Sequence, residues 1–252
     1  MRSLSLALGR ARLENRAFWR NPAAAFFTVV FPLLFLIVAS VALADPLGGR
    51  TEAARFYTPS IMTFALITAC YTNLAMGVVM AREAGILKQL RGTPLPIWAY
   101  VSGRIGQAVF VATLLATLIG LYGAIVNGVS PPLEEMPWLV LVLAVGAASF
   151  SALGLAVTAA VPNAGAAPAL INATILPLLL ISDVLVPLDQ GLLATVAGIF
   201  PVRHLADALA AAYDPSVSVA AGDAALSLLI VAAWGLAGFV VALRTFSWSP
   251  RG

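Results

Sequence analysis

Long apolar runs separated by short polar segments dominate the chain. Six of these runs are long enough, at about 1.5 Å of helix per residue, to cross a hydrocarbon layer about 30 Å thick. They cover residues 23–44, 56–80, 97–127, 138–161, 166–186 and 224–243. The pattern therefore predicts an all-α, polytopic membrane protein in which residues 1–252 form a single transmembrane domain.

The end of the first run offers a second interpretation. Ala42-Leu43-Ala44 resembles a signal-peptidase site, which would make this run a cleaved signal. The apolar core of such a signal is usually only about 7–15 residues long. Because the run at residues 23–44 is longer than that, we favour a membrane span.

An amphipathic pattern precedes the first span. At helical spacing, apolar residues follow one side of residues 1–22, and arginines form the neighbouring stripe. The apolar side holds Leu4, Leu8, Ala11 and Phe18, and the stripe holds Arg12, Arg16 and Arg20. We expect an interfacial helix in the headgroup layer, with its basic stripe toward anionic lipid.

A short basic segment separates the second and third runs and contains Lys88, the only lysine in the chain. Its apolar residues share one helical face, and its basic residues lie around that face. The apolar residues are Ile86, Leu87 and Leu90, and the basic ones are Arg82, Lys88 and Arg91. Gly92 is expected to end this helix. Thr93 and Pro94 then form a cap and a first turn for the next helix.

We interpret residues 82–94 as a cytoplasmic helix that docks on another protein and is joined by an elbow to the third span. Leu87 and Leu90 would fill a groove on that partner, where burial of one leucine contributes roughly 1.5–3 kcal/mol. The alternative is a solvated positive loop that only fixes topology. The leucines matter in the first interpretation, and only the charges matter in the second.

Composition and charge distribution refine this picture. The chain is 61% hydrophobic and 10% charged, whereas a soluble domain carries about 25% charged residues. The net charge of only +3 gives no reason to expect nucleic acid as a partner. If the N-terminus is cytoplasmic, eleven of the fourteen lysines and arginines lie on the inner side. Since positive charge concentrates in cytoplasmic loops, we expect both termini in the cytoplasm.

A few polar side chains fall inside the spans. Asn73, Gln107 and Asn172 could line a substrate path. They could equally form hydrogen bonds between helices, which is the commoner use of such residues. At the start of the third span, Tyr100 fits an interfacial aromatic belt, and Arg104 can extend to the same surface.

Small residues recur every four positions in the third and fourth spans. They are Ala108, Ala112, Ala116, Gly120 and Ala124 in the third span, and Ala144, Ala148, Ala152, Ala156 and Ala160 in the fourth. Small side chains let helix backbones approach closely in a membrane, so we expect these two stripes to form helix contacts. The alternative is a chain that is simply rich in alanine.

Reactive residues are too few for most enzymatic sites. A nucleotide-binding P-loop needs Gly-x-x-x-x-Gly-Lys-[Ser/Thr], and the sole lysine, Lys88, follows Leu87. The single histidine, His204, excludes the His-Glu-x-x-His zinc site. Asp214 and Asp223 share one loop instead of lying on facing spans, which disfavours an intramembrane aspartyl protease. We therefore expect no catalytic residues, no metal site and no cofactor bound by this chain.

Two segments resemble ABC transporter permeases of the type-2 exporter family. The family typically shows Glu-Arg-Glu-x-Gly-Thr-Leu-Lys in its first cytoplasmic loop, followed by a Thr-Pro step, and residues 82–96 are similar to that pattern. Residues 200–209 are similar to the short outer helices between spans five and six in actinobacterial drug-exporter permeases. Ala81 and Ile86 depart from the family pattern, as does Asp183 near the end of span five.

The resemblance implies the membrane half of an exporter in a bacterial plasma membrane. A separate cytoplasmic ABC ATPase would bind ATP and Mg²⁺, and a second permease copy or a related permease would complete the assembly. The substrate would be hydrophobic or amphipathic: a drug, a lipid or a glycan. The residues that would couple to the ATPase are Arg82, Glu83, Gly85, Leu87, Lys88, Leu90, Arg91, Thr93 and Pro94.

Two rival classes stay open on the sequence alone. An ATP-independent secondary carrier or channel would usually place charged or proton-relay residues near the membrane midplane, and the spans show none there. A membrane-bound enzyme would need catalytic groups. An importer permease is a further variant, but its Glu-Ala-Ala loop has glycine four residues beyond, whereas Gly85 directly follows Glu83-Ala84 here.

Overall fold

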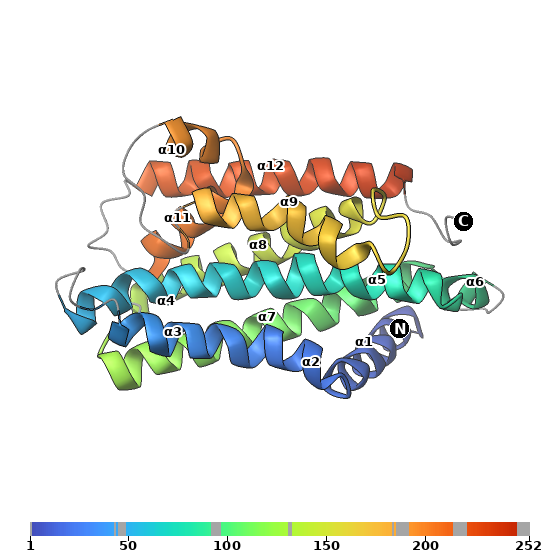
Figure 1. Cartoon of the computed structure of the whole chain (residues 1–252), viewed down its shortest axis with the longest axis horizontal. Coiled ribbons are helices and arrows are strands. Elements are labelled where there is room, and N and C mark those ends of the chain that lie inside the picture. Colours follow the sequence, from blue (N-terminus) through green and yellow to red (C-terminus); the bar gives the residue numbers. More distant parts are fainter. Residues whose placement is uncertain are drawn as a thin grey trace.

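The computed structural model describes residues 2–42, 44, 49–91, 97–130, 133–182, 184, 192–213 and 221–245. These residues form helices and short turns, with no strand among them, so the predicted all-α membrane fold is confirmed. The helices lie side by side along one direction (Figure 1). We refer to the two ends of this bundle as the α6 end and the α10 end, after the short helices found there.

Among the described residues, five stretches of helix are long and apolar enough to cross a membrane. The first is Pro22–Ala42, made of α2 (Pro22–Ala25), η1 (Phe26–Val30) and α3 (Phe31–Ala42), and the second is Arg50–Glu83, made of α4 (Arg50–Ile67), η3 (Thr68–Asn73) and α5 (Leu74–Glu83). The others are Ala99–Asn127 (in α7), Leu133–Val157, made of η4 (Leu133–Glu135) and α8 (Met136–Val157), and Gly222–Thr245 (in α12). The sixth, α9 (Ala167–Ile181), has 15 residues. At about 1.5 Å per residue it rises only about 22 Å. The expected fifth span, residues 166–186, is therefore a shorter helix, and Asp183 lies outside the described residues.

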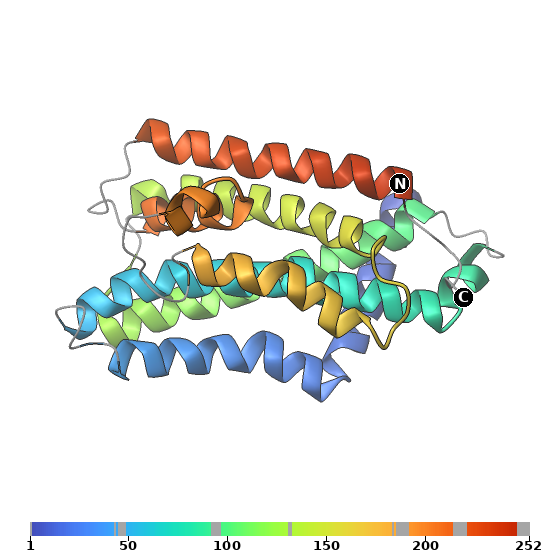
Figure 2. The same ribbon diagram turned by 45° about the horizontal axis from the view of Figure 1, so that its top comes forward.

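The remaining helices are short or lie at the bundle's ends. The amphipathic helix α1 (Arg2–Trp19) lies at an angle to the spans at the α6 end (Figure 1). The segment α6 (Ile86–Arg91) precedes α7 (Ile97–Asn127), and α10 (Leu192–Ala197) with α11 (Pro201–Tyr213) precedes α12 (Ala221–Thr245). The start of α1 and the end of α12 both lie at the α6 end (Figures 1 and 2), as an even number of crossings requires.

Glycines set the closest approach between helices, chiefly around α8 (Met136–Val157). A Cβ atom built on Gly235 of α12 would lie 2.3 Å from Ser149 Oγ, and one built on Gly238 would lie 3.0 Å from the backbone N of Leu153. On the opposite side of α8, a Cβ on Gly154 would lie 2.9 Å from the carbonyl oxygen of Tyr71. Helices α8 and α12 therefore pack along nearly their whole lengths, as Figure 2 shows.

The expected alanine stripes are only partly correct. In α7, Ala108, Ala112 and Ala116 are buried as the spacing indicated. In α8, Ala144 and Ala148 are exposed, and the contacts to α12 are made by the glycines of α12 instead. The difference arises because a four-residue repeat marks a helical face but does not identify the neighbour that covers it.

The helix α11 is inserted among the spans. Leu205, Ala208 and Leu209 are fully buried on its inner face, and Leu205 lies over Gly146 of α8. His204 contacts both the carbonyl of Gly198 and the hydroxyl of Ser227 in α12, at 2.8 and 3.2 Å. The short helices predicted between spans five and six are thus present as α10 and α11.

The glycine at position 154 provides a direct test of this packing. We expect Gly154→Leu to lower the unfolding free energy by about 2 kcal/mol, because its side chain would collide with the backbone of η3. Gly222→Leu is the matched control, since a Cβ there meets nothing within 4 Å. Thermal unfolding of the detergent-solubilised protein measures both variants. Equal stability of the two would contradict the assigned helix contact.

Candidate coupling site and transport path

The turn between α5 and α6 lies at Ala84–Gly85, earlier than the sequence suggested. Helix α5 (Leu74–Glu83) extends the second span to Glu83, so Arg82 and Glu83 belong to the span. Gly85 has φ of +72°, a left-handed conformation that glycine adopts without strain. Gly85 is thus the residue at which the span ends. Gly92, which was predicted to end the basic helix, lies outside the described residues. Residues 92–96, with Thr93 and Pro94, lie outside the described part of the chain.

Arg82 is directed into the protein. It is 2% exposed, and its guanidinium donates to the carbonyls of Thr158, at 3.1 Å, and Val161, at 2.5 Å. Both carbonyls lie in the turns that follow α8, close to the negative end of that helix's dipole. A buried arginine in this position satisfies those groups and joins the end of α5 to the end of α8.

Leu87 is also directed inward. It is fully buried in a small cluster with Ala81 and Tyr100, so it anchors α6 to its own chain. The expectation that Leu87 fills a groove on a partner is therefore wrong, because the side chain has no exposed surface to offer. The outward side of α6 presents Lys88 and Gln89, both exposed, together with Ile86 at 40% exposure. The side chains of Leu90 and Arg91 are outside the described set.

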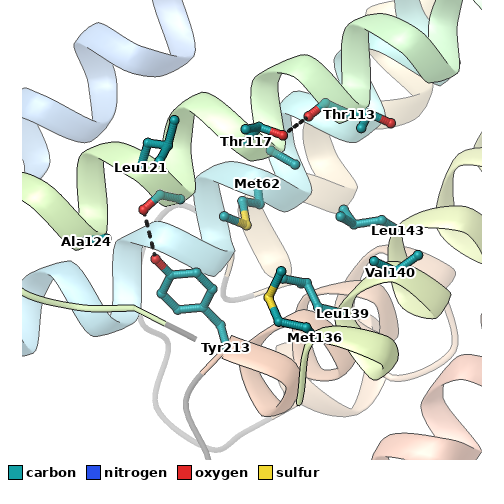
Figure 3. A pocket seen from close by; sticks show the side chains of 12 residues that line it. Met62, Thr113, Thr117, Leu121, Ala124, Met136, Leu139, Val140, Leu143 and Tyr213 are labelled. Atoms are coloured by element: carbon teal, nitrogen blue, oxygen red, sulfur yellow. Dashed lines mark hydrogen bonds between the residues drawn. The ribbon is translucent and has the colours of Figure 1, made fainter. Parts of the chain in front are cut away.

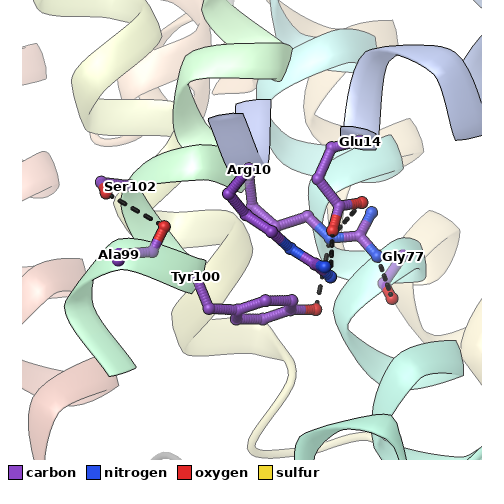
Figure 4. Close-up of polar contacts among 7 residues, drawn as sticks. Arg10, Glu14, Gly77, Ala99, Tyr100 and Ser102 are labelled. Atoms are coloured by element: carbon purple, nitrogen blue, oxygen red, sulfur yellow. Dashed lines mark hydrogen bonds and ion pairs between the residues drawn. The ribbon is translucent and has the colours of Figure 1, made fainter. Parts of the chain in front are cut away.

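Tyr100 lies beneath a cluster of charged side chains (Figure 4). Glu14 of α1 is 6% exposed and contacts Arg10 at 2.5 Å and Arg104 at 3.2 Å. The guanidiniums of Arg10 and Arg104 lie 5.0 and 5.8 Å from the centre of the Tyr100 ring. Arg104 also donates to the Tyr100 hydroxyl and to the carbonyl of Gly77 in α5, each at 3.2 Å. The cluster thus joins α1, α5 and α7.

Two glycines leave room for these arginines. A Cβ on Gly77 would lie 2.5 Å from an Arg104 guanidinium nitrogen, and a Cβ on Gly103 would lie 2.7 Å from Cγ of Arg10. Larger residues at either position would displace an arginine from Glu14. The geometry of the cluster therefore depends on both glycines as well as on the charges.

The sequence did not reveal this cluster. Tyr100 was expected in an interfacial belt, but it is 1% exposed and covered by α1 and α6. The available signal was spacing, since Arg10 with Glu14 and Tyr100 with Arg104 are each four residues apart. Such pairs share one helical face. The link between the two pairs spans about ninety residues of sequence and cannot be obtained from spacing.

The three residues expected along a substrate path lie on different helices. Asn73 ends the π-helical segment η3 (Thr68–Asn73) and donates to the hydroxyl of Thr28 in a second π-helical segment, η1 (Phe26–Val30). Gln107 is buried in α7, and Asn172 is half-buried in α9. The structure does not join these side chains by hydrogen bonds. For Asn73, the interhelical contact is the role that is observed.

Loss of the buried carboxylate should release α1 from the spans. We expect Glu14→Gln to lower the unfolding free energy by about 2 kcal/mol, because two guanidiniums lose their anionic partner. Glu52→Gln is the control: Glu52 is 61% exposed and pairs with Arg55 at the surface, so its loss should cost under about 0.5 kcal/mol. Thermal unfolding and protease cleavage within α1 measure the effect. A Glu14→Gln protein as stable and as resistant as the wild type would contradict the assignment.

Comparison with known proteins agrees with this architecture. The family described as ABC-2 type transporter matches residues 11–213, from the middle of α1 to the end of α11. Over 144 residues the chain is 28% identical to the "Putative transport permease YvfS" of Bacillus subtilis (strain 168). That alignment covers 56% of this chain and 58% of the relative, so the chain spans less than two thirds of the relative's length. Because the family match extends over most of the sequence, the chain belongs to the ABC-2 type transporter family.

Proposed function

We propose that this chain is the membrane-spanning subunit of an ATP-driven exporter for a hydrophobic or amphipathic substrate. A separate cytoplasmic ATPase would bind ATP and Mg²⁺, and a second permease copy would complete the pathway. Family membership supports the transport class. The observation that carries the coupling role is α6, whose outward side is free to dock while its inward side is fixed to the bundle.

The contacts of α6 provide a route for motion. Leu87 connects α6 to Tyr100 of α7, and Tyr100 lies under the guanidiniums that hold Glu14 of α1. Arg82, just before the turn, connects the same region to the end of α8. A displacement of α6 by an ATPase would therefore be passed to α1, α7 and α8 together. Such rigid-body tilting of packed helices is a known means of opening a pathway on alternate sides.

The exposed side of α6 should determine ATPase binding. We expect Lys88→Glu and Ile86→Asp to reduce copurification of a co-expressed candidate ATPase subunit and to abolish export. Both side chains are exposed, so the permease itself should remain folded. Loss of one buried charge contact or apolar contact corresponds to about 2 kcal/mol, or about 30-fold in affinity.

Two controls separate docking from folding and from topology. Arg244→Glu reverses a charge at the same end of the bundle, on the exposed end of α12, and should leave ATPase binding unchanged. Leu87→Ala should lower the stability of the permease, because this side chain is buried against Tyr100. Normal ATPase binding and normal export in both α6 variants would defeat the coupling assignment. Export driven by an ion gradient without ATP would instead favour a secondary carrier.

Membrane orientation gives an independent prediction. We expect the α6 end to face the cytoplasm, because most arginines and the single lysine lie in segments at that end. Tags added to Met1 and Gly252 should both be protected from a membrane-impermeant reagent in intact cells. Labelling of either tag from outside would contradict the orientation, whatever the chain transports.

A further inference from the structure

A groove lies between α7 and α8, away from the coupling site. Its volume is about 320 Å³, and Figure 3 shows side chains of α4, α7, α8 and α11 around it. Met62 of α4 lies at its base, Met136 and Val140 lie on the α8 side, and Leu121 lies on the α7 side. Neither the coupling cluster nor Asn73, Gln107 or Asn172 lines this groove.

The lining is apolar, and most of its few polar groups are already paired. The hydroxyl of Thr117 donates to the carbonyl of Thr113 at 2.9 Å. The hydroxyl of Tyr213 donates to the carbonyl of Val129 at 3.0 Å. A polar ligand would lose its hydrogen bonds to water and gain few in return, which is costly. The groove therefore favours an apolar occupant.

The groove opens sideways, toward the hydrocarbon that surrounds the spans. Leu121 and Val140 flank its opening and are 50% and 60% exposed. Both belong to candidate membrane spans. A further helix is about 10–12 Å wide with its side chains. A single acyl chain is narrower and is the abundant apolar molecule at this depth.

Gly120 and the methionine side chains make the groove suitable for an acyl chain. Gly120 leaves the α7 wall open, and a Cβ there would meet only the terminal methyl of Met62, at 3.2 Å. Methionine side chains are flexible and polarisable, so they adjust to an irregular apolar ligand. We propose that this groove binds one acyl chain of a bilayer phospholipid, inserted between α7 and α8 as a structural lipid. This site is independent of the ATPase and of the transported substrate.

The test uses a phosphatidylcholine that carries a diazirine near the middle of one acyl chain. The purified permease is reconstituted into liposomes of this lipid without ATPase or cargo, illuminated, and digested for peptide mass spectrometry. Met62 and Leu139 line the groove and are only 2% and 6% exposed. A lipid that merely covers the outer surface would not label them, whereas an acyl chain that enters by displacing the flexible Met62 side chain would. Labelling is normalised to Leu236 of α12, which is 65% exposed.

We expect adducts on Met62 and Leu139 in the wild type. Gly120→Leu should lower the yield of these adducts about tenfold, because the leucine side chain would exclude about two methylene groups of the acyl chain from the groove. Ala124→Leu places a leucine at the other end of the same α7 wall and should lower the adducts in the same way. With two blocking variants, the result does not depend on a folding defect of either one. Ile125→Phe is the matched control on the same helix, at a position 79% exposed and outside the groove, and should retain the adducts.

Three results would overturn the proposal. Wild-type adducts on Met62 and Leu139 that do not exceed those on fully buried Ile61 would show that no chain enters. Adducts that persist in correctly folded Gly120→Leu and Ala124→Leu proteins would show entry elsewhere. Adducts on Met62 and Leu139 that appear in monomeric permease but are absent from a dimer separated from it by size-exclusion chromatography would assign the groove to an interface between permease copies. None of these results would bear on ATPase coupling.

Discussion

The charge cluster over Tyr100 is the interaction on which the α6 end of the molecule depends. A carboxylate as buried as that of Glu14 is stable only when it is paired and hydrogen-bonded. Arg10 and Arg104 provide the pairing, and the Tyr100 ring, its hydroxyl and the Gly77 carbonyl take up the remaining positive charge and donors. These partners come from three helices, so the cluster fixes how α1, α5 and α7 are arranged. Leu87 then attaches α6 to the same tyrosine.

Close packing and hydrogen bonds hold the rest of the bundle together. Spans in lipid must satisfy their backbone groups internally, and they associate by close packing and hydrogen bonds because hydrocarbon does not drive them together. Gly154, Gly235 and Gly238 provide the close packing around α8. The hydrogen bond from Asn73 to Thr28 joins two π-helical segments, a rare geometry that is often found at functional sites. The first two spans are therefore joined at positions where both helices are locally π-helical.

The sequence predicted those features that depend on local pattern. Run lengths indicated the spans, and the spacing of apolar and basic residues indicated α6, because both patterns lie in consecutive residues. The helix α11 was expected only from the resemblance of residues 200–209 to the family. The sequence did not predict in which direction individual side chains point. Arg82 and Leu87 were both expected to face a partner protein, yet their neighbours are Thr158, Val161 and Tyr100, which no local periodicity connects to them. The basic helix was expected to run unbroken from Arg82 to Gly92, and the turn at Gly85 divides it, which the glycine itself could have indicated. The brevity of α9 was hidden by an apolar run that continues beyond the helix.

The central claim is that the exposed side of α6 is the surface on which the proposed ATPase docks. The chain suits a direct measurement, because its single native cysteine, Cys70, is buried and will not compete for a thiol reagent. A Gln89→Cys protein would be labelled with a maleimide–diazirine crosslinker and illuminated in the presence of the co-expressed ATPase subunit. Our account predicts a covalent permease–ATPase product from position 89, which is exposed on α6, and none from Glu134→Cys, which is exposed near the α10 end. A product from position 134, or none from position 89 in a complex that is intact by size-exclusion chromatography, would contradict it.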